Sequence, residues 1–232
     1  TFVIFLDAFK ASTGMTAWVG SLNRACMNFI GPVSSMLTNK YGSRHVVILG
    51  GVISAIGLGT SAFATNIYQL YMTYGIIAGG GLGLAYIPAT IIINDYFATK
   101  RTLAFGIATS GFGVGSFLYP LLIEALNEEY GWRGAMLILS GIGLNICVCG
   151  VLMRPFSTHE LVRESDNNAT VFNFGIMKSL NFSILCFNYL VYHFGIAIVF
   201  THLSEYSLLM GIGRTESSML FSVFGITNIV GL

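Results

Sequence analysis

Long apolar stretches, separated by short polar ones, run through the whole chain. A helix that crosses a bilayer needs roughly 20 mostly apolar residues. We predict spanning helices of about this length at residues 16–37, 46–64, 70–93, 103–123, 134–153 and 180–203. The apolar residues 1–9 and 217–232 are too short for a complete span, and we expect them to be parts of two further helices. The pattern predicts an all-α polytopic membrane protein, and we expect the chain to be a piece of a longer one.

The composition supports a membrane protein and argues against several other classes. Of all residues, 54% are hydrophobic and 9% are charged, whereas soluble domains carry about 25% charged residues. The four cysteines lie inside apolar stretches without a Cys-x-x-Cys spacing, so we expect packing thiols. The sequence has no nucleophile–base array, no cluster of metal ligands and no basic patch that suits nucleic acid. We therefore expect neither an enzyme nor a protein that binds a cofactor, a metal or nucleic acid.

Basic residues gather in the polar segments on one side of the predicted membrane. These segments are residues 38–45, 94–102 and 154–178. They carry seven basic residues, Lys40, Arg44, Lys100, Arg101, Arg154, Arg163 and Lys178. The opposite side carries three, Lys10, Arg133 and Arg214. Because cytoplasmic loops have an excess of Lys and Arg, we expect the three segments to be cytoplasmic.

The most polar segment divides the chain. It covers residues 154–178, and Pro155 prevents the preceding helix from continuing. We predict an N-terminal six-helix bundle at 1–153, a cytoplasmic linker at 154–178 and the start of a second bundle at 179–232. Two six-helix bundles joined in this way are typical of a large class of transporters.

Glycine spacing marks expected helix contacts in the middle of the chain. Gly79 and Gly83 are four residues apart, as are Gly111 and Gly115, so each pair lies on one helix face. Small residues at such spacing let membrane helices approach closely. We predict that each pair marks a tight contact between helices.

Three prolines lie inside predicted helices. They are Pro32, Pro88 and Pro120. Each removes a backbone donor and can kink its helix, which transporters tolerate around a cavity. Simple curvature of the helix is the alternative interpretation.

Arg24 is the strongest candidate for chemistry, because it stands near the middle of the predicted helix 16–37. A central arginine costs about 2.5–3.5 kcal/mol on insertion scales, so it should face a cavity or a partner. Asn23 precedes it, and Asn28 lies four residues further on, on the same face. A guanidinium can bind a carboxylate through two parallel hydrogen bonds. Two interpretations stay open: a substrate site formed by Arg24, Asn23 and Asn28, or a structural pairing of Arg24 with an acid or with carbonyls of another helix.

A second candidate is His193, in the middle of the predicted helix 180–203 and next to Tyr192. A histidine within a membrane can relay protons. We therefore name Tyr192 and His193 as candidate residues of a substrate path. A hydrogen-bonded packing histidine is the alternative.

Six motifs together carry a family resemblance. They are TAWVGS at 16–21, GPVSSMLTNKYGSR at 31–44, YFATKRTLAFGIATSG at 96–111, GWRGAMLILSGIGLN at 131–145, RPF at 154–156 and FGITNIVG at 224–231. With them the chain closely resembles the monocarboxylate transporters of the major facilitator superfamily over essentially its whole length. The resemblance implies twelve helices, alternating access, and carriage of a small carboxylate or amino-acid-like metabolite across the plasma membrane. It also implies a single-span immunoglobulin-like chaperone, which members often need at the cell surface.

The resemblance also implies roles for single residues. Asn39, Gly42 and Arg44 match the family's gating loop after the second helix, and Arg101 matches the arginine of its basic motif before the fifth. Arg24, with Asn23 before it, falls where the second helix lines the family's cavity.

The eighth helix of the family bears on proton coupling. Proton-coupled members have an aspartate and an arginine where this chain has Asn228 and Leu232. An asparagine cannot carry the proton, so H+ is a doubtful partner, although Asn228 can still contact a substrate. We therefore expect a secondary carrier of facilitative type. The alternative is a truncated, non-transporting form that modulates the full-length carrier or fails to assemble.

Overall fold

The computed structural model describes residues 5, 9, 12–97 and 100–153, with scattered positions between 180 and 195. In this described part every regular element is a helix, which confirms the all-α prediction. The elements are α2 (Thr13–Phe29), α3 (Gly31–Tyr41), α4 (Ser43–Ser61), α5 (Ile67–Leu70), the π-helix η1 (Tyr71–Ala78), α6 (Gly79–Tyr96), α7 (Arg101–Gly143) and α8 (Asn145–Leu152). Three helical stretches are long and apolar enough to cross a membrane, at Ser43–Ser61, Ile67–Tyr96 and Thr102–Leu152.

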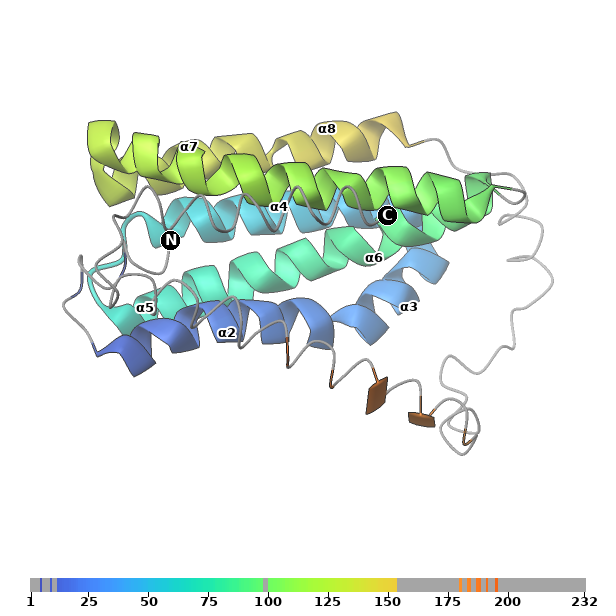
Figure 1. Cartoon of the computed structure of the whole chain (residues 1–232), viewed down its shortest axis with the longest axis horizontal. Coiled ribbons are helices and arrows are strands. Elements are labelled where there is room, and N and C mark those ends of the chain that lie inside the picture. Colours follow the sequence, from blue (N-terminus) through green and yellow to red (C-terminus); the bar gives the residue numbers. More distant parts are fainter. Residues whose placement is uncertain are drawn as a thin grey trace.

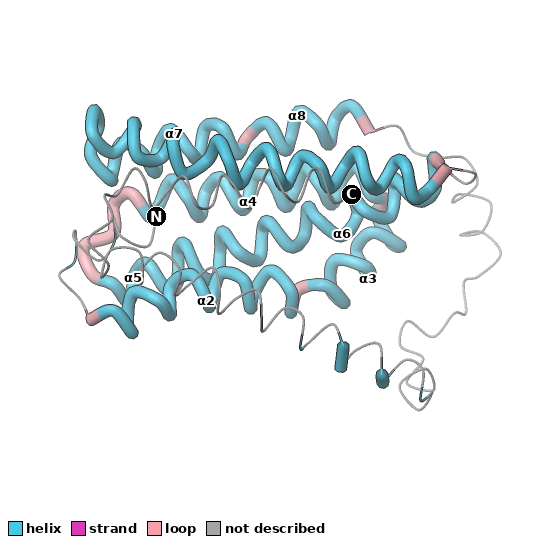
Figure 2. Tube along the Cα trace, in the orientation of Figure 1, coloured by secondary structure: helices cyan, strands magenta, loops and turns pink. Residues whose placement is uncertain are grey.

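The helices form a bundle in which α4 and α6 lie side by side at the centre (Figure 1). The α7 and α8 helices pack along α4, while α2 and α3 pack along η1 and α6 (Figures 1 and 2). The turn between α4 and α5 lies at one end of the bundle and the turn between α3 and α4 at the other. We call these the α4–α5 end and the α3–α4 end.

The predicted span at 16–37 is two helices in the structure. The backbone turns at Ile30, whose N–H bonds the carbonyls of Cys26 and Asn28, and α3 begins directly afterwards with Pro32 in its first turn. A proline has no N–H and its ring clashes with the carbonyl four residues earlier, so it suits a helix start better than an interior. Pro32 therefore separates α2 from α3.

The other predicted spans correspond to longer elements. The span at 70–93 is α5, η1 and α6 in direct succession, with Pro88 buried inside α6. The spans at 103–123 and 134–153 meet within α7, which is interrupted at Gly131 by a φ of 66°. A positive φ is easy only for glycine, so this residue divides α7 at the α4–α5 end.

The expected polar loop at 38–45 is almost entirely helical. Helix α3 ends at Tyr41 and α4 begins at Ser43, with Gly42 alone between them at a φ of 83°. Both α3 and α4 extend into the polar residues between the two predicted spans. They do so because Gly42 is the residue that interrupts the helix. At 94–102, α6 continues to Tyr96 and α7 starts at Arg101.

Small residues let α6 contact its two neighbours closely. A Cβ built at Gly79 would lie 2.5 Å from the carbonyl oxygen of Asn23 in α2, and one at Gly83 would meet the Met27 carbonyl. On another face of α6, a Cβ at Gly81 would meet the backbone nitrogen of Ser54 in α4. The predicted tight contact is therefore confirmed for Gly79 and Gly83.

The second predicted glycine contact is not seen among the described residues. No described atom lies within 4 Å of a Cβ built at Gly111 or Gly115.

Side-chain donors add hydrogen bonds between helices. The Ser34 hydroxyl of α3 donates to the Leu84 carbonyl of α6 at 3.1 Å. The Ser140 hydroxyl of α7 donates to the Ala55 carbonyl of α4 at 2.7 Å. Such bonds, together with small residues, hold helices together where lipid is the surrounding solvent.

An apolar core fills the α4–α5 end. Its buried members are Phe5, Val19, Ala62, Ala64, Ile67, Leu70, Ile123, Met136 and Leu139. Four partly buried aromatic side chains, Phe9, Tyr71, Tyr74 and Trp132, pack against this core. The core joins α2, α5, both parts of α7 and the turn that follows α4.

Candidate functional site

One face of α2 is fastened to η1. The Tyr71 hydroxyl donates to the Met15 carbonyl at 2.8 Å, and Val19, one turn further along α2, is buried. Further along the same face, the Leu22 side chain fills the space beside Gly75. The Asn23 amide donates to the Tyr74 carbonyl at 2.7 Å. These contacts therefore fix both the rotation of α2 about its axis and its position along η1.

Arg24 lies at the edge of this fastened face. Successive helical residues are about 100° apart, so the residue after Asn23 emerges on the flank of the contact with η1. Arg24 is exposed although it lies about 16 Å along the helix axis from the start of α2, at 1.5 Å per residue. A residue at this distance along a spanning helix would lie near the middle of a hydrocarbon core, which is about 30 Å thick.

Two tyrosines accompany Arg24. The charge of Arg24 acts on the Tyr74 side chain, and Tyr119 of α7 also lies within electrostatic range of Tyr74. Tyr119 is exposed and Tyr74 is half-buried. A guanidinium with neighbouring phenolic hydroxyls is a set of hydrogen-bond donors that suits a small anion.

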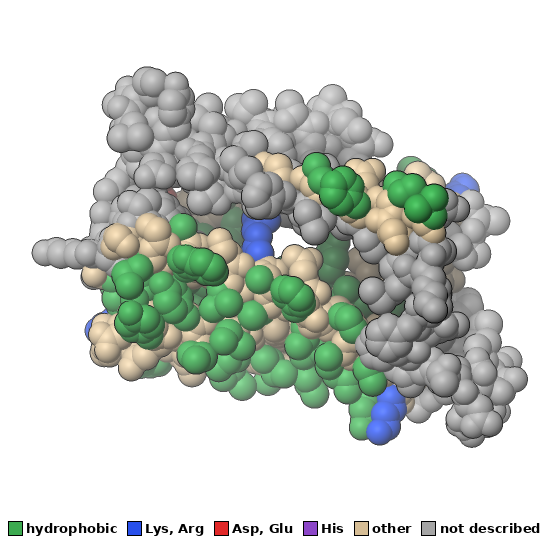
Figure 3. All heavy atoms as spheres, turned by 90° about the horizontal axis from the view of Figure 1, so that it is seen from below, with side chains coloured by type: hydrophobic (Ala, Val, Ile, Leu, Met, Phe, Trp, Pro, Cys, Tyr) green, Lys and Arg blue, Asp and Glu red, His purple; other side chains and the backbone are tan. Residues whose placement is uncertain are grey.

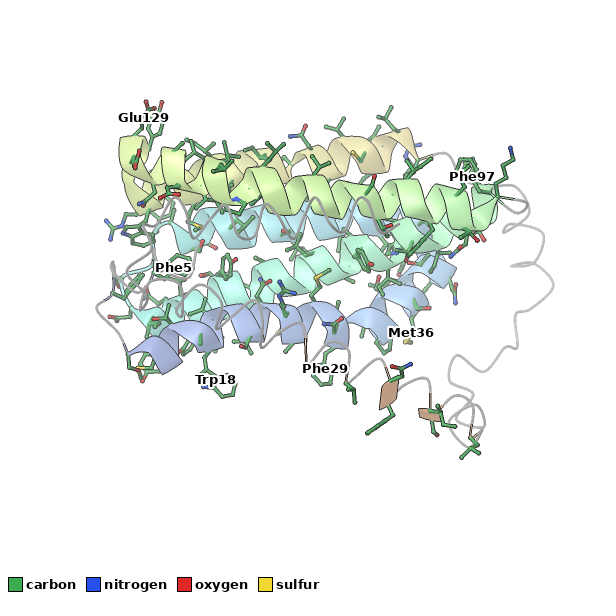
Figure 4. The ribbon with its side chains drawn as sticks, in the orientation of Figure 1. Phe5, Trp18, Phe29, Met36, Phe97 and Glu129 are labelled. Carbon is green, nitrogen blue, oxygen red and sulfur yellow. The ribbon has the colours of Figure 1, made fainter. Side chains whose placement is uncertain are left out.

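The space-filling view agrees with this arrangement. One face of the bundle is hollowed near its middle, and a basic side chain lies in the hollow (Figure 3). Trp18, Phe29 and Met36, by contrast, point away from the bundle (Figure 4). Phe29 is 84% exposed, so this outer surface of α2 and α3 is apolar and suited to lipid or to another part of the protein. Arg24 therefore lies between a packed face and an apolar outer face of the same helix.

The two asparagines near Arg24 differ in their contacts. Asn28 is exposed, and its amide donates to the Arg24 carbonyl at 2.9 Å within α2. Asn23 instead donates to another helix through the Tyr74 carbonyl. The structure thus brings Arg24 and Asn28 together on one side of α2, while the Asn23 amide contacts the neighbouring helix.

The predicted gating residues lie at the α3–α4 end. Gly42 ends α3, with its N–H bonded to the Thr38 carbonyl at 2.9 Å, and directly precedes α4. Asn39 and Arg44 are exposed on either side of it, and Arg101 is the first residue of α7. Phe97, at the end of α6, lies at this end of the bundle, opposite to Glu129 (Figure 4).

Three predicted substrate residues, Tyr192, His193 and Asn228, lie outside the described residues. The same holds for the linker at 154–178. Among the residues that are described, no group of His, Cys, Asp and Glu side chains could hold a metal ion.

An aromatic cluster was missed by the sequence analysis. The ring of Phe5 stands edge-on to the rings of Tyr74 and Trp132, with distances between ring centroids of 5.6 Å and 6.4 Å. The ring centroids of Phe9 and Trp132 are 5.3 Å apart. Through Tyr74, the cluster connects the α4–α5 end with the surroundings of Arg24. A weak signal exists in the sequence, since Tyr74 follows Tyr71 and Thr73 in a short run of hydroxyl-bearing residues within a largely apolar span.

Comparison with known proteins identifies the class. The chain matches the model of the Major Facilitator Superfamily over residues 1–232. It belongs to this superfamily of membrane transporters.

Individual relatives give the family within that class. Monocarboxylate transporter 12 of Xenopus laevis is 35% identical over 253 residues, which cover 99% of this chain and 55% of that protein. Monocarboxylate transporter 14 of Homo sapiens is 44% identical over 155 residues, which cover 67% of this chain and 30% of that protein. Monocarboxylate transporter 12-B of Danio rerio is 34% identical, with 99% of this chain and 54% of that protein covered. The chain is a member of the monocarboxylate transporter family and spans about half the length of the transporter 12 relatives.

Proposed function

We propose that the protein to which this chain belongs is a secondary carrier for a small monocarboxylate or a related amino-acid-like metabolite, working by alternating access in the plasma membrane. The names of the similar proteins support this substrate class. We further propose that the transport is facilitative, because an asparagine at position 228 cannot carry a proton. A single-span immunoglobulin-like chaperone belongs to the same proposal.

The observation that carries the proposal is the position of Arg24. It is exposed on α2, with Tyr74 within electrostatic reach. A charged side chain at this depth is costly unless water, a partner or a solute meets it. A carboxylate that enters the hollow can accept two parallel hydrogen bonds from the guanidinium, with further donors from the phenolic hydroxyls.

Charge distribution supports the proposed orientation. The exposed Lys40, Arg44 and Lys100 all lie at the α3–α4 end, where α8 also ends (Figure 1). At the other end, Arg133 lies over the Trp132 ring at 5.3 Å. An excess of basic residues at the α3–α4 end favours a cytoplasmic location for it. In this orientation the linker at 154–178 is cytoplasmic as well.

The test is uptake by the full-length carrier. Radiolabelled pyruvate, lactate and a set of zwitterionic amino acids are offered to cells with and without a pH gradient. We expect saturable uptake of at least one of these compounds, with little effect of the gradient. Arg24→Ala is expected to lower that uptake at least tenfold at unchanged surface amount, because one lost charge-assisted contact is worth about 1.5–3 kcal/mol.

Arg133→Ala is the matched control, because it removes an arginine that lies at the end of the bundle, over Trp132. Its uptake should equal that of the parent. Normal uptake by Arg24→Ala, or equal losses in both variants, would refute the role of Arg24. Uptake that collapses without a pH gradient would refute the facilitative mechanism.

A further inference from the structure

Asn23 contacts the neighbouring helix with both its backbone and its side chain. Its carbonyl oxygen and Cα lie 2.5 and 3.0 Å from a Cβ built at Gly79, so only a hydrogen at that position leaves room for α2. Its amide donates to the Tyr74 carbonyl at 2.7 Å. These two contacts are on successive turns of η1 and α6, and together they fix the position of Asn23 along and around the neighbouring helix.

The acceptor of this hydrogen bond lies in an unusual segment. Tyr74 is in the π-helix η1, where a continuous pattern would bring the Gly79 N–H to the Tyr74 carbonyl. The Gly79 N–H bonds the Ile76 carbonyl. Asn23 supplies a side-chain donor to the last π-helical turn, next to the point where α6 begins.

We propose that Asn23 is a positioning residue: its hydrogen bond to the Tyr74 carbonyl holds the π-helical turn of η1 against α2 and so sets Tyr74 and Arg24 side by side as the two arms of the anion site. This inference deepens the proposed carriage of a carboxylate at Arg24 and rests on it. Asn23 acts on the anion through its two neighbours, and its amide is engaged with the backbone of η1 rather than with the solute.

Two features of the structure explain why a single amide suffices. Arg24 directly follows Asn23, so any rotation of α2 about its axis moves the guanidinium. Tyr74 carries the accepting carbonyl itself, so any shift of η1 moves its ring. The ring is held from the other side by Phe5, whose centroid lies 5.6 Å away. The hydrogen bond from Asn23 to the Tyr74 carbonyl therefore fixes the position of the Arg24 side chain relative to that of Tyr74.

The first test measures geometry without a substrate. Arg24→Cys is introduced into the full-length carrier together with Cys26→Ser, and the rate at which a negatively charged methanethiosulfonate reagent modifies the new thiol is measured in intact cells. Asn23→Leu, which keeps the volume and removes the donor, is expected to change this rate by about threefold to eighteenfold, the range that corresponds to loss of one interhelical hydrogen bond. Asn23→Gln retains an amide donor and should bring the rate back towards that of the parent.

Asn145→Leu is the matched control, because the Asn145 amide donates locally across the α7–α8 junction, to the Ile142 carbonyl three residues earlier at 2.9 Å. It should leave the modification rate unchanged. If Asn23→Leu fails to reach the surface, Asn23→Ser, whose hydroxyl is too short to reach the same carbonyl, takes its place. Equal rates in the parent, Asn23→Leu and Asn23→Ser would overturn the inference, and so would a change of equal size in Asn145→Leu.

The second test uses pyruvate uptake and separates this inference from the proposed function. Asn23→Leu should raise the KM severalfold with a smaller change in Vmax, while Asn23→Gln should recover much of the affinity. If Arg24→Ala leaves uptake intact, the proposed function fails, whatever the thiol measurement shows. If Arg24→Ala abolishes uptake but Asn23→Leu changes neither the KM nor the thiol rate, the proposed function stands and the positioning role of Asn23 is refuted.

Discussion

Replacing Gly79 by alanine should separate α2 from α6. The new methyl group would lie 2.5 Å from the Asn23 carbonyl oxygen, whereas ordinary contacts begin at 3.4 Å, so the helices must move apart by up to about 0.9 Å. The obstacle is backbone and cannot rotate away, in contrast to the end of a flexible side chain. Overpacking of this kind costs typically about 1–3 kcal/mol. We expect a loss of this size in the free energy of unfolding.

The neighbouring Gly80 provides a close control. It belongs to the same run of three glycines, but no described atom lies within 4 Å of a Cβ built there. Gly80→Ala should therefore be neutral or slightly stabilising, because alanine favours a helix over glycine by about 1 kcal/mol in an interior position. The two variants differ by one position in sequence and by about 100° around the helix.

The assay is thermal unfolding of the purified full-length carrier in detergent, followed by uptake at equal surface amount. Gly79→Ala should melt below the parent and transport less, because the shift of α2 also displaces Arg24. Gly80→Ala should melt at or above the parent temperature. Equal midpoints for the two variants, or a more stable Gly79→Ala, would show that α2 does not pack on α6 as described.

Three further predictions concern other contacts. Gly42→Ala should destabilise the α3–α4 turn by about 1 kcal/mol, seen as a lower melting temperature, because its φ of 83° is strained for a residue with a Cβ. Ser140→Ala removes the 2.7 Å hydrogen bond to the Ala55 carbonyl. It should lower the free energy of unfolding by about 0.6 kcal/mol, and by no more than about 1.7 kcal/mol, in the same melting assay. Gly51→Ala places a Cβ 2.8 Å from the Cys147 sulfur and should lower the melting temperature. Adding Cys147→Ala should restore part of this loss in the double variant. If the effects of the two single variants on the melting temperature are fully additive, the contact between these residues is contradicted.

Much of the fold follows from the length of apolar stretches, and its breaks follow from particular residues. The spans at 46–64 and 70–93 correspond to α4 and to the α5–α6 succession with small shifts at their ends. The break at Ile30 was not predicted, although Pro32 was recognised as a possible kink. Whether a proline bends a helix or begins a new one depends on local backbone angles that the residue pattern does not contain.

The candidate site was predicted only in part. Arg24 is evident from sequence because a charge in an apolar span is costly. Tyr74 was not found, because its approach to Arg24 depends on η1, where the π-helical turn changes which side chains share a face. The separation of 51 residues between Asn23 and Tyr74 also gives no local signal. The roles predicted for Tyr192 and His193 stay predictions.

The single residue between α3 and α4 also limits how the bundle can rearrange. Helix α3 ends at Tyr41 and α4 begins at Ser43, so the chain has no slack there. Consecutive Cα atoms stay about 3.8 Å apart, and the two helix ends cannot separate by more than the reach of Gly42. Any change of the angle between these helices must therefore pivot on one residue, with the far ends of the helices travelling while the near ends remain tethered.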